Sequence, residues 1–260
     1  MRQPIAKRRR RAEPTVRRGA RRWLRAPDAD VWRRLVPRPA LARLHDAQDP
    51  KRKIRRHVGA LFIDVEGCTR LCEELPPEEM NELLETYFSA FLDAVRAAGG
   101  EVTEVMGDGL LALFEADEAR ATARSALRAA LDARTRARQL NARRRRQHDP
   151  IEVNMGLNAG EALVGFTRLR GRSGERWVYA ATGPVTNVAA RLAALARGGQ
   201  TLTTRETAAT LAGACACRSL GPHTLKNVAH PVDVVEVMDP TTARRPADRS
   251  EISQANAGDA

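Results

Sequence analysis

The chain has few aromatic residues, only four cysteines and no long apolar run. No segment approaches the roughly 18 consecutive apolar residues of a membrane-spanning helix, and no apolar stretch follows the basic N-terminus as a secretory signal requires. We therefore expect no transmembrane segment, a cytoplasmic location and reduced thiols. The CxxxC and CxC spacings lack the partners of a zinc site, so we interpret the cysteines as small buried hydrophobes: Cys68, Cys72, Cys215 and Cys217.

Two catalytic patterns are also missing. There is no GxxxxGK[ST] motif, which excludes a P-loop, and no cluster of histidines or cysteines suits hydrolytic catalysis. With 43% hydrophobic residues in 260, the chain can nevertheless bury the core of one large or two small domains.

The positive charge is concentrated at the N-terminus. Residues 1–56 hold 20 Lys and Arg against 5 Asp and Glu, which is +15, and the other 204 residues hold 24 against 27, which is −3, so that the chain carries +12. Few apolar residues and scattered prolines predict that residues 1–56 form a disordered Arg-rich tail. Contact with nucleic acid or an anionic membrane surface is one interpretation of this tail. We prefer a solvated tail, because no nucleic-acid-binding module accompanies the charge.

Residues 57–238 have the pattern of a folded domain, and the polar residues 239–260 predict a disordered C-terminal tail. The order of elements predicts an α+β fold with helices packed against a mostly antiparallel sheet. Apolar runs predict strands at 58–64, 101–106, 110–114, 151–158, 161–165, 177–181, 200–203, 217–220 and 232–237. Apolar residues at helical spacing predict helices at 68–75, 77–98, 117–146, 185–196 and 205–211.

Two aspartates lie at the ends of predicted strands. Asp64 ends the first strand and precedes a turn into a helix, whose free amides could receive phosphate oxygens. Asp108 lies at the tip of a Gly-Asp-Gly hairpin turn. Two such carboxylates could hold two magnesium ions, which activate an oxygen nucleophile and neutralise a triphosphate. Taken alone, either aspartate would more often be a turn or capping residue.

A third pair of polar residues, Asn187 and Arg191, lies on the predicted helix 185–196. Residues four apart share a helix face, so the amide and the guanidinium project together while the apolar residues between them pack. The alternative is a surface polar pair without a role in catalysis.

Together these segments resemble the catalytic domain of class III adenylate/guanylate cyclases. The resemblance covers about residues 57–238 and keeps the order of the family's motifs. The motifs are LFIDVEGCTRL (61–71), EVTEVMGDGLLALF (101–114), GLNAGEALVG (156–165), GPVTNVAARL (183–192) and LKNVAHPVDVVEV (225–237).

The resemblance implies a ferredoxin-like βααββαβ core with extra C-terminal strands, which dimerises head to tail and builds each site between two protomers. Asp64, Asp108 and the backbone of Val65 would hold two Mg²⁺ or Mn²⁺ ions from one protomer. Asn187 would orient the ribose from the other protomer, and Arg191 would stabilise charge on the α-phosphate. The reaction would convert ATP or GTP to a 3′,5′-cyclic nucleotide and pyrophosphate.

The resemblance also implies contacts to the phosphates and to the base. Phosphate contacts would come from Gly67, Cys68, Thr69 and Lys226; an exposed loop lysine is the alternative for Lys226. At the two base-specifying positions, adenylate cyclases of the family usually have Lys with Asp or Thr, and guanylate cyclases have Glu with Cys. This chain has Glu104 and Ala180, which is half of the guanine pattern, so the choice between ATP and GTP stays open.

Two other functions remain compatible with the sequence. One is a catalytically silent cyclase-like module that binds a nucleotide or a partner and is anchored by the basic tail. A silent module is expected to have lost at least one of the metal-binding or transition-state residues, and none is lost. The other is a nucleic-acid-binding protein that acts through residues 1–56.

Overall fold

The computed structural model describes residues 34–46, 52–144 and 150–238. The predicted C-terminal tail and most of the predicted N-terminal tail lie outside these ranges. From Pro37 onward the described residues belong to one compact unit. Its helices are α2 (Arg38–Asp46), α3 (Cys68–Glu74), α4 (Pro77–Ala97), α5 (Ala119–Arg144), α6 (Pro184–Leu195) and α7 (Arg205–Thr210). Its strands are β1 (Ile54–Val65), β2 (Glu101–Met106), β3 (Gly109–Glu115), β4 (Val153–Gly171), β5 (Gly174–Thr182), β6 (Thr201–Thr204), β7 (Cys217–His223) and β8 (Val232–Val237).

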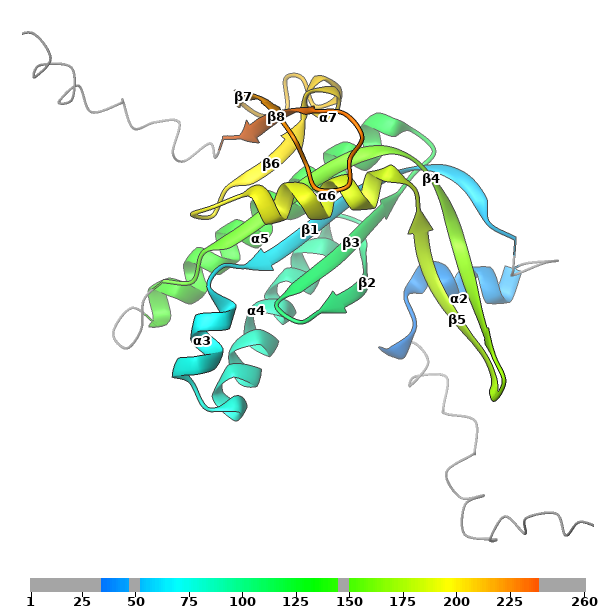
Figure 1. The fold of residues 1–260 in the computed structure, drawn as a ribbon, viewed down its shortest axis with the longest axis horizontal. Coiled ribbons are helices and arrows are strands. Elements are labelled where there is room, and N and C mark those ends of the chain that lie inside the picture. Colours follow the sequence, from blue (N-terminus) through cyan, green and yellow to red (C-terminus); the bar gives the residue numbers. More distant parts are fainter. Residues whose placement is uncertain (1–33, 47–51, 145–149, 239–260) are drawn as a thin grey trace, which may run out of the picture. The chain divides into compact units, whose positions relative to one another are not determined.

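One sheet joins all the described strands, in the order β2-β3-β1-β4-β6-β8-β7, and β5 pairs with β4. Every pairing is antiparallel except that of β4 with β6. The succession β1, α3, α4, β2, β3, α5, β4 is the predicted βααββαβ order, and later strands extend the sheet. The predicted α+β fold is therefore confirmed (Figure 1).

Helices cover both faces of the sheet, with α6 on one face and α4 and α5 on the other (Figure 1). Two glycines allow helices α5 and α6 to pack close to the backbone of the sheet. A Cβ at Gly59 in β1 would lie 2.6 Å from a backbone oxygen of α5, and a Cβ at Gly156 in β4 would lie 1.9 Å from a backbone oxygen of α6. Because Gly156 pairs with Phe62 and side chains alternate along a strand, Phe62 and Asp64 point to the α6 face.

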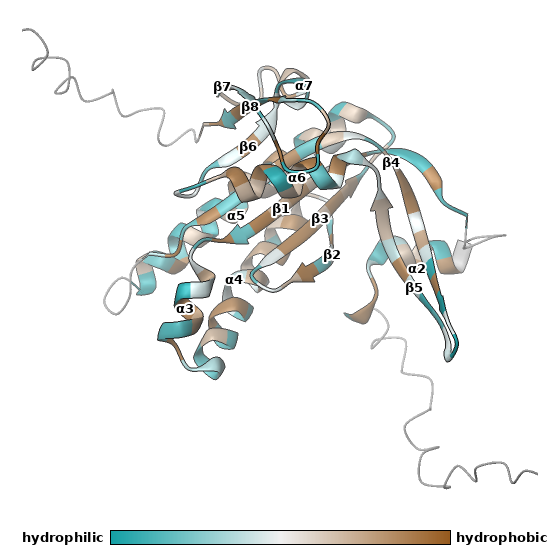
Figure 2. Ribbon diagram, viewed as in Figure 1, coloured by the Kyte–Doolittle hydropathy of each residue, from teal (hydrophilic) through white to brown (hydrophobic). Residues whose placement is uncertain are grey.

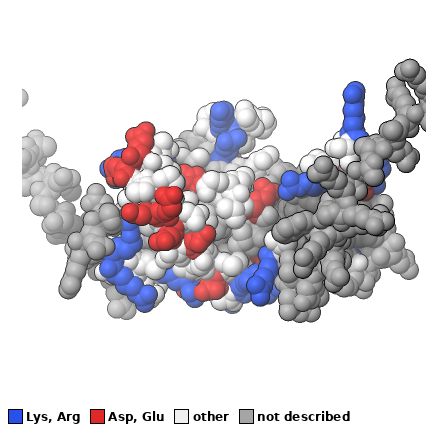
Figure 3. All heavy atoms as spheres, turned by 90° about the horizontal axis from the view of Figure 1, so that it is seen from below, with Lys and Arg blue, Asp and Glu red and all other residues white. Residues whose placement is uncertain are grey.

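The main core lies between the sheet and helices α4 and α5. Figure 2 shows that hydrophobic residues are concentrated along β1 and β3, the strands at the centre of this layer. Leu61, Ile63 and Phe114 are fully buried there. No helix among the described residues is both long and apolar enough to cross a bilayer. Acidic and basic side chains are interspersed on the face seen in Figure 3.

The N-terminal boundary of the fold differs from the prediction. The sequence predicts disorder through residue 56, but β1 begins at Ile54 and helix α2 covers Arg38–Asp46. The guanidinium of Arg38 donates a hydrogen bond of 2.5 Å to the buried carboxylate of Glu101. The prediction was wrong here because it took high charge as a sign of disorder. A charged side chain can leave water when it forms a charge-assisted hydrogen bond with a partner in the fold, as Arg38 does with Glu101.

The middle of the sheet also differs from the prediction. The sequence predicts separate strands at 151–158 and 161–165, whereas β4 is continuous. Gly160, which resembles a turn residue in the sequence, pairs in register with Val58 of β1. A glycine in a central strand is tolerated here because both neighbouring residues keep their ladder partners.

Candidate active site

Asp64 and Asp108 lie next to each other at one end of the sheet. Asp64 is near the end of β1 and pairs with Gly109 at the start of β3. A Cβ at Gly109 would lie 3.3 Å from the Asp64 Oδ1 atom, so the carboxylate lies over this glycine. Asp108 occupies the turn between β2 and β3, and its carbonyl oxygen accepts a hydrogen bond of 3.1 Å from the Val65 amide. The hairpin prediction for residues 107–109 is confirmed, and it brings the two carboxylates together.

The electrostatics of this pair favour a cation. Partial burial, followed by the Asp108 carboxylate, raises the pKa of Asp64 to about 6, and Glu66 acts in the same direction. The guanidinium of Arg197 opposes the rise but does not cancel it. Negative charge is thus crowded at the end of β1, and a bound divalent cation would relieve the repulsion.

The donor set fits magnesium or manganese. Carboxylate and backbone oxygens are the ligands that Mg²⁺ prefers, and Mg²⁺ commonly takes only one or two carboxylates from a protein and the rest from waters and substrate phosphates. The described residues contain no group of three or more His, Cys, Asp or Glu side chains that could hold a metal ion. The two aspartates alone would therefore leave coordination positions open to water or to a ligand.

The turn from β1 into α3 holds the predicted phosphate contacts. Gly67 has φ 73°, a left-handed conformation that glycine adopts without steric cost, and it precedes the first residue of α3. Cys68 is buried, and burial together with the neighbouring Asp108 raises the pKa of its thiol to about 12. Thr69 is exposed. Cys68 thus lies beside Asp108, and the contact of these three residues with phosphate stays a prediction.

A hydrogen-bonded cluster behind Asp64 was not predicted from the sequence. Glu66 Oε2 accepts a hydrogen bond of 3.1 Å from Asn154 Nδ2 and one of 2.7 Å from the Gly198 amide. Asn154, 2% exposed and paired with Asp64 across β1 and β4, accepts a hydrogen bond of 3.1 Å from the Gly199 amide. The cluster ties the β1–α3 turn to the loop after α6. The available signal was Asn154, a polar residue between the apolar residues Val153 and Met155 of the predicted strand.

Helix α6 places Asn187 and Arg191 on the same face of the sheet as Asp64. Ala189 packs on Gly156 in β4, which leaves Asn187 exposed and Arg191 half-exposed. Among the residues that the structure describes, neither makes a hydrogen bond or an ion pair with the two aspartates. Within one chain, Asn187 and Arg191 are thus not joined to the two aspartates.

The remaining predicted site residues are spread over the sheet. Glu104 is half-buried on β2 and pairs with Leu111 of β3. Ala180 is on β5, a strand that does not neighbour β2 in the sheet. Lys226 is exposed in the loop between β7 and β8, immediately after Leu225, which packs in the small core under α6. The structure of one chain does not bring these three residues together.

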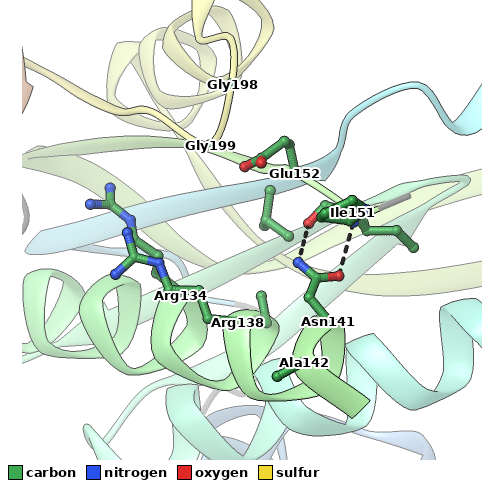
Figure 4. A pocket seen from close by; sticks show the side chains of 11 residues that line it. Arg134, Arg138, Asn141, Ala142, Ile151, Glu152, Gly198 and Gly199 are labelled. Carbon is green, nitrogen blue, oxygen red and sulfur yellow. Dashed lines mark hydrogen bonds between the residues drawn. The ribbon is translucent and has the colours of Figure 1, made fainter. Parts of the chain in front are cut away.

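A cavity of about 420 Å³ lies on the α5 side of the sheet (Figure 4). Its lining includes Arg134, Arg138 and Glu152, and the Asn141 side chain bridges both backbone groups of Ile151 at its edge. None of the predicted site residues lines it. The candidate site is therefore the aspartate pair rather than this cavity.

The raised pKa of Asp64 predicts a cost to stability that the asparagine variant removes. The folded-state pKa of about 6 lies above the ordinary value of 3.8. Ionised Asp64 therefore lowers the free energy of unfolding in full above about pH 6, and this penalty vanishes below about pH 4, where the group is protonated in both states. In metal-free buffer near neutral pH, Asp64→Asn should raise Tm by about 2 to 4 °C. Thermal unfolding of both proteins at about pH 7.5 and about pH 4 measures this. A lower Tm for Asp64→Asn at neutral pH would contradict the assigned cause.

Comparisons with known proteins identify a family for this chain. The sequence profile of the family described as the adenylate and guanylate cyclase catalytic domain matches residues 51–235. Adenylate cyclase 1 of Rhizobium meliloti is 30% identical over 188 residues, which are 71% of this chain and 28% of that protein. The chain spans about a quarter of the length of the curated relatives it matches.

Solved structures of cyclase domains have the same fold. The adenylyl cyclase CyaB from P. aeruginosa is 27% identical, with a TM-score of 0.67 over 72% of this chain and 96% of that chain. The guanylyl cyclase Cya2 is 28% identical, with a TM-score of 0.61 over 71% of this chain and 93% of that chain. Cyclase domains named for either nucleotide are thus similar to this one. With the family profile spanning most of the chain and both aspartates brought together, the chain belongs to the family of adenylate and guanylate cyclase catalytic domains.

Proposed function

We propose that the chain converts a purine nucleoside triphosphate, ATP or GTP, to its 3′,5′-cyclic nucleotide and pyrophosphate, with two Mg²⁺ or Mn²⁺ ions. The observation that carries the proposal is the aspartate pair, in which two carboxylates crowd at the end of β1 and one has a pKa raised to about 6. Family membership supports the same reaction. Two adjacent carboxylates can bind divalent cations, and these cations can in turn bind the oxygens of a triphosphate.

Each side chain has a defined task in this proposal. Asp64, Asp108 and the Val65 carbonyl hold the cations, which when bound favour loss of the ribose 3′ hydroxyl proton and neutralise the triphosphate. Amides of the turn before α3 receive phosphate oxygens, and Cys68 keeps that turn anchored in the core.

The second half of the site comes from α6. Asn187 orients the ribose, and the Arg191 guanidinium stabilises negative charge on the α-phosphate as the 3′ oxygen attacks and pyrophosphate leaves. The proposal places Lys226 at the leaving phosphates. Because Asn187 and Arg191 do not contact the aspartates within one chain, we infer a head-to-tail homodimer in which each site combines α6 of one protomer with the aspartates of the other.

The reaction has a direct test. Purified full-length protein incubated with Mg²⁺ or Mn²⁺ and either ATP or GTP should release a cyclic nucleotide, identified by mass, together with one pyrophosphate for each product. Release of a linear nucleoside monophosphate or diphosphate instead would show hydrolysis and overturn the proposal. No turnover with either nucleotide and either cation, although the nucleotide binds, would favour a silent nucleotide-binding module.

The base preference of the proposed site follows from Glu104. A carboxylate can accept hydrogen bonds from guanine N1–H and from the 2-amino group, whereas adenine presents only an acceptor at N1. We therefore propose that GTP is preferred over ATP by about 5- to 150-fold in kcat/KM, the effect of leaving a polar group unpaired. Ala180 offers guanine O6 no hydrogen-bond donor, so we expect the preference for GTP to lie toward the lower end of this range.

The paired substitution Glu104→Lys with Ala180→Thr should move the preference toward ATP. The lysine supplies a donor to adenine N1 and the threonine supplies an acceptor for the 6-amino group. The ratio of kcat/KM for the two nucleotides, measured on wild type and variant, reports the change. Glu161→Lys makes the same charge change at an exposed position on β4 and should leave the ratio unaltered. A wild-type preference for ATP that the paired substitution does not change would show that Glu104 does not face the base.

A further inference from the structure

Two of the four cysteines are close together and neither is fully buried, which corrects the interpretation of all four as buried hydrophobes. Only Cys68 is fully buried, whereas Cys72 and Cys217 are exposed and Cys215 is half-buried. The Sγ atoms of Cys215 and Cys217 lie 3.6 Å apart. The prediction was wrong for these two residues because, in a turn that leads into an edge strand, the two thiols of a CxC sequence can lie on the same side.

The backbone around this pair is anchored on both sides. Cys217 is the first residue of β7, an outer strand of the sheet, and pairs with Val237 of β8. The Met238 amide donates a hydrogen bond of 2.9 Å to the carbonyl oxygen of Ala216, the residue between the two cysteines. Cys215 packs against the main core. The short distance between the sulfur atoms is thus set by strand pairing and packing.

The two thiols differ in a way that suits sequential oxidation. Cys217 is exposed and can meet a small oxidant in solution. Burial and the neighbouring Cys217 raise the pKa of Cys215 to about 12, so that Cys215 stays a thiol at neutral pH. An accessible sulfur that reacts first, with a second thiol beside it, is the arrangement of a reactive cysteine and its resolving partner.

We propose that Cys215 and Cys217 form a redox pair that hydrogen peroxide closes reversibly to an intramolecular disulfide. The Cys217 thiolate attacks one peroxide oxygen, the O–O bond breaks, and the leaving hydroxide takes a proton to form water, which leaves a sulfenic acid on Cys217. The Cys215 sulfur then attacks the Cys217 sulfur, and the S–O bond breaks. The departing hydroxide takes the Cys215 proton as a second water. In total, two thiols and one peroxide give one disulfide and two waters.

Reversibility follows from the size of the ring. Closing the bond brings the sulfur atoms from 3.6 Å to about 2.05 Å, which a side-chain rotation of the exposed Cys217 supplies. With a single residue between the cysteines, the ring is small and constrained by the β7–β8 pairing. Strained and exposed disulfides are reduced more easily than structural ones, so a dithiol should reopen this bond.

The test uses the full chain and one proteolytic peptide. Trypsin cleaves after Arg205 and after Arg218, which places Cys215 and Cys217, but neither Cys68 nor Cys72, in one fragment. After brief peroxide treatment and blocking of free thiols, most of this fragment should be lighter by two hydrogen atoms and should carry no blocking group. Treatment with dithiothreitol before blocking should restore two blocked thiols.

Three single variants separate a pair from two independent thiols. Cys217→Ser should leave Cys215 reduced and blocked, and Cys215→Ser should stop Cys217 at the sulfenic acid, which dimedone traps. Cys72→Ser removes the other exposed thiol and should leave closure of the pair unchanged. The proposal is overturned if wild-type Cys217 is trapped by dimedone as fully as in Cys215→Ser, or if its disulfide joins two chains. This result is independent of cyclase activity.

Discussion

Replacing Asp64 or Asp108 by alanine should lower the rate of cyclic nucleotide formation by at least about 100-fold. The two carboxylates lie side by side at the ends of β1 and the β2–β3 turn, so loss of either leaves one side chain to hold both cations against a triphosphate. Initial rates at saturating Mg²⁺ and nucleotide measure the loss. Excess Mn²⁺ should not restore wild-type rates, because the missing ligand is not replaced.

The chain offers a matched control for these two variants. Asp117 follows β3 with an almost fully exposed side chain, 98% accessible, and pairs only with Arg56 at 3.2 Å among the described residues. Asp117→Ala is the same type of substitution at an exposed position outside the site, and it should keep nearly full activity. Retention of more than about a tenth of wild-type activity in either site variant would contradict the two-metal proposal.

Mixing inactive Asp108→Ala protein with inactive Arg191→Ala protein should restore activity. If the aspartates and α6 of one site come from different protomers, a mixed dimer contains one site with both defects and one site with neither. Random exchange makes half of the dimers mixed, so recovery should approach about a quarter of the wild-type number of sites. Activity after denaturation-free subunit exchange, followed over time, measures this.

A second mixture distinguishes shared sites from simple stabilisation by a partner. Asp64→Ala mixed with Asp108→Ala should recover nothing, because both variants damage the same half of the site and every site in a mixed dimer lacks one aspartate. Recovery in this second mixture would contradict the assignment of both aspartates to one protomer. Absence of recovery in the first mixture, although tagged subunits co-purify as mixed dimers, would show that each protomer builds its own site.

Much of the fold follows from local patterns in the chain. The apolar run that ends at Asp64, the helical spacing of residues 77–98 and the Gly-Asp-Gly turn are short-range signals, and all three form the predicted elements. A tight hairpin leaves few alternatives for the register of its two strands. Once β1 pairs with β3, Asp108 therefore comes to lie beside the end of β1.

Other features depended on contacts between distant segments. The Glu66–Asn154–Gly198 cluster joins residues separated by 88 and 132 positions, and no local pattern marks them as partners. The continuity of β4 through Gly160 depends on its partner strand. Helix α2 was hidden in a segment whose charge predicted disorder, since the buried carboxylate of Glu101 that receives Arg38 lies 63 positions away.

The sequence by itself determined the family, the order of the core elements from β1 to β4 and the position of the two aspartates at strand ends, because these depend on residue types and short spacings. Only the tertiary structure decided which groups meet. Burial and proximity to Asp108 raised the pKa of Asp64, and strand pairing brought Cys215 and Cys217 to 3.6 Å while leaving one of them exposed. Burial, distance and charge repulsion are properties of the assembled sheet, and they arise only when segments far apart in the chain pack against one another.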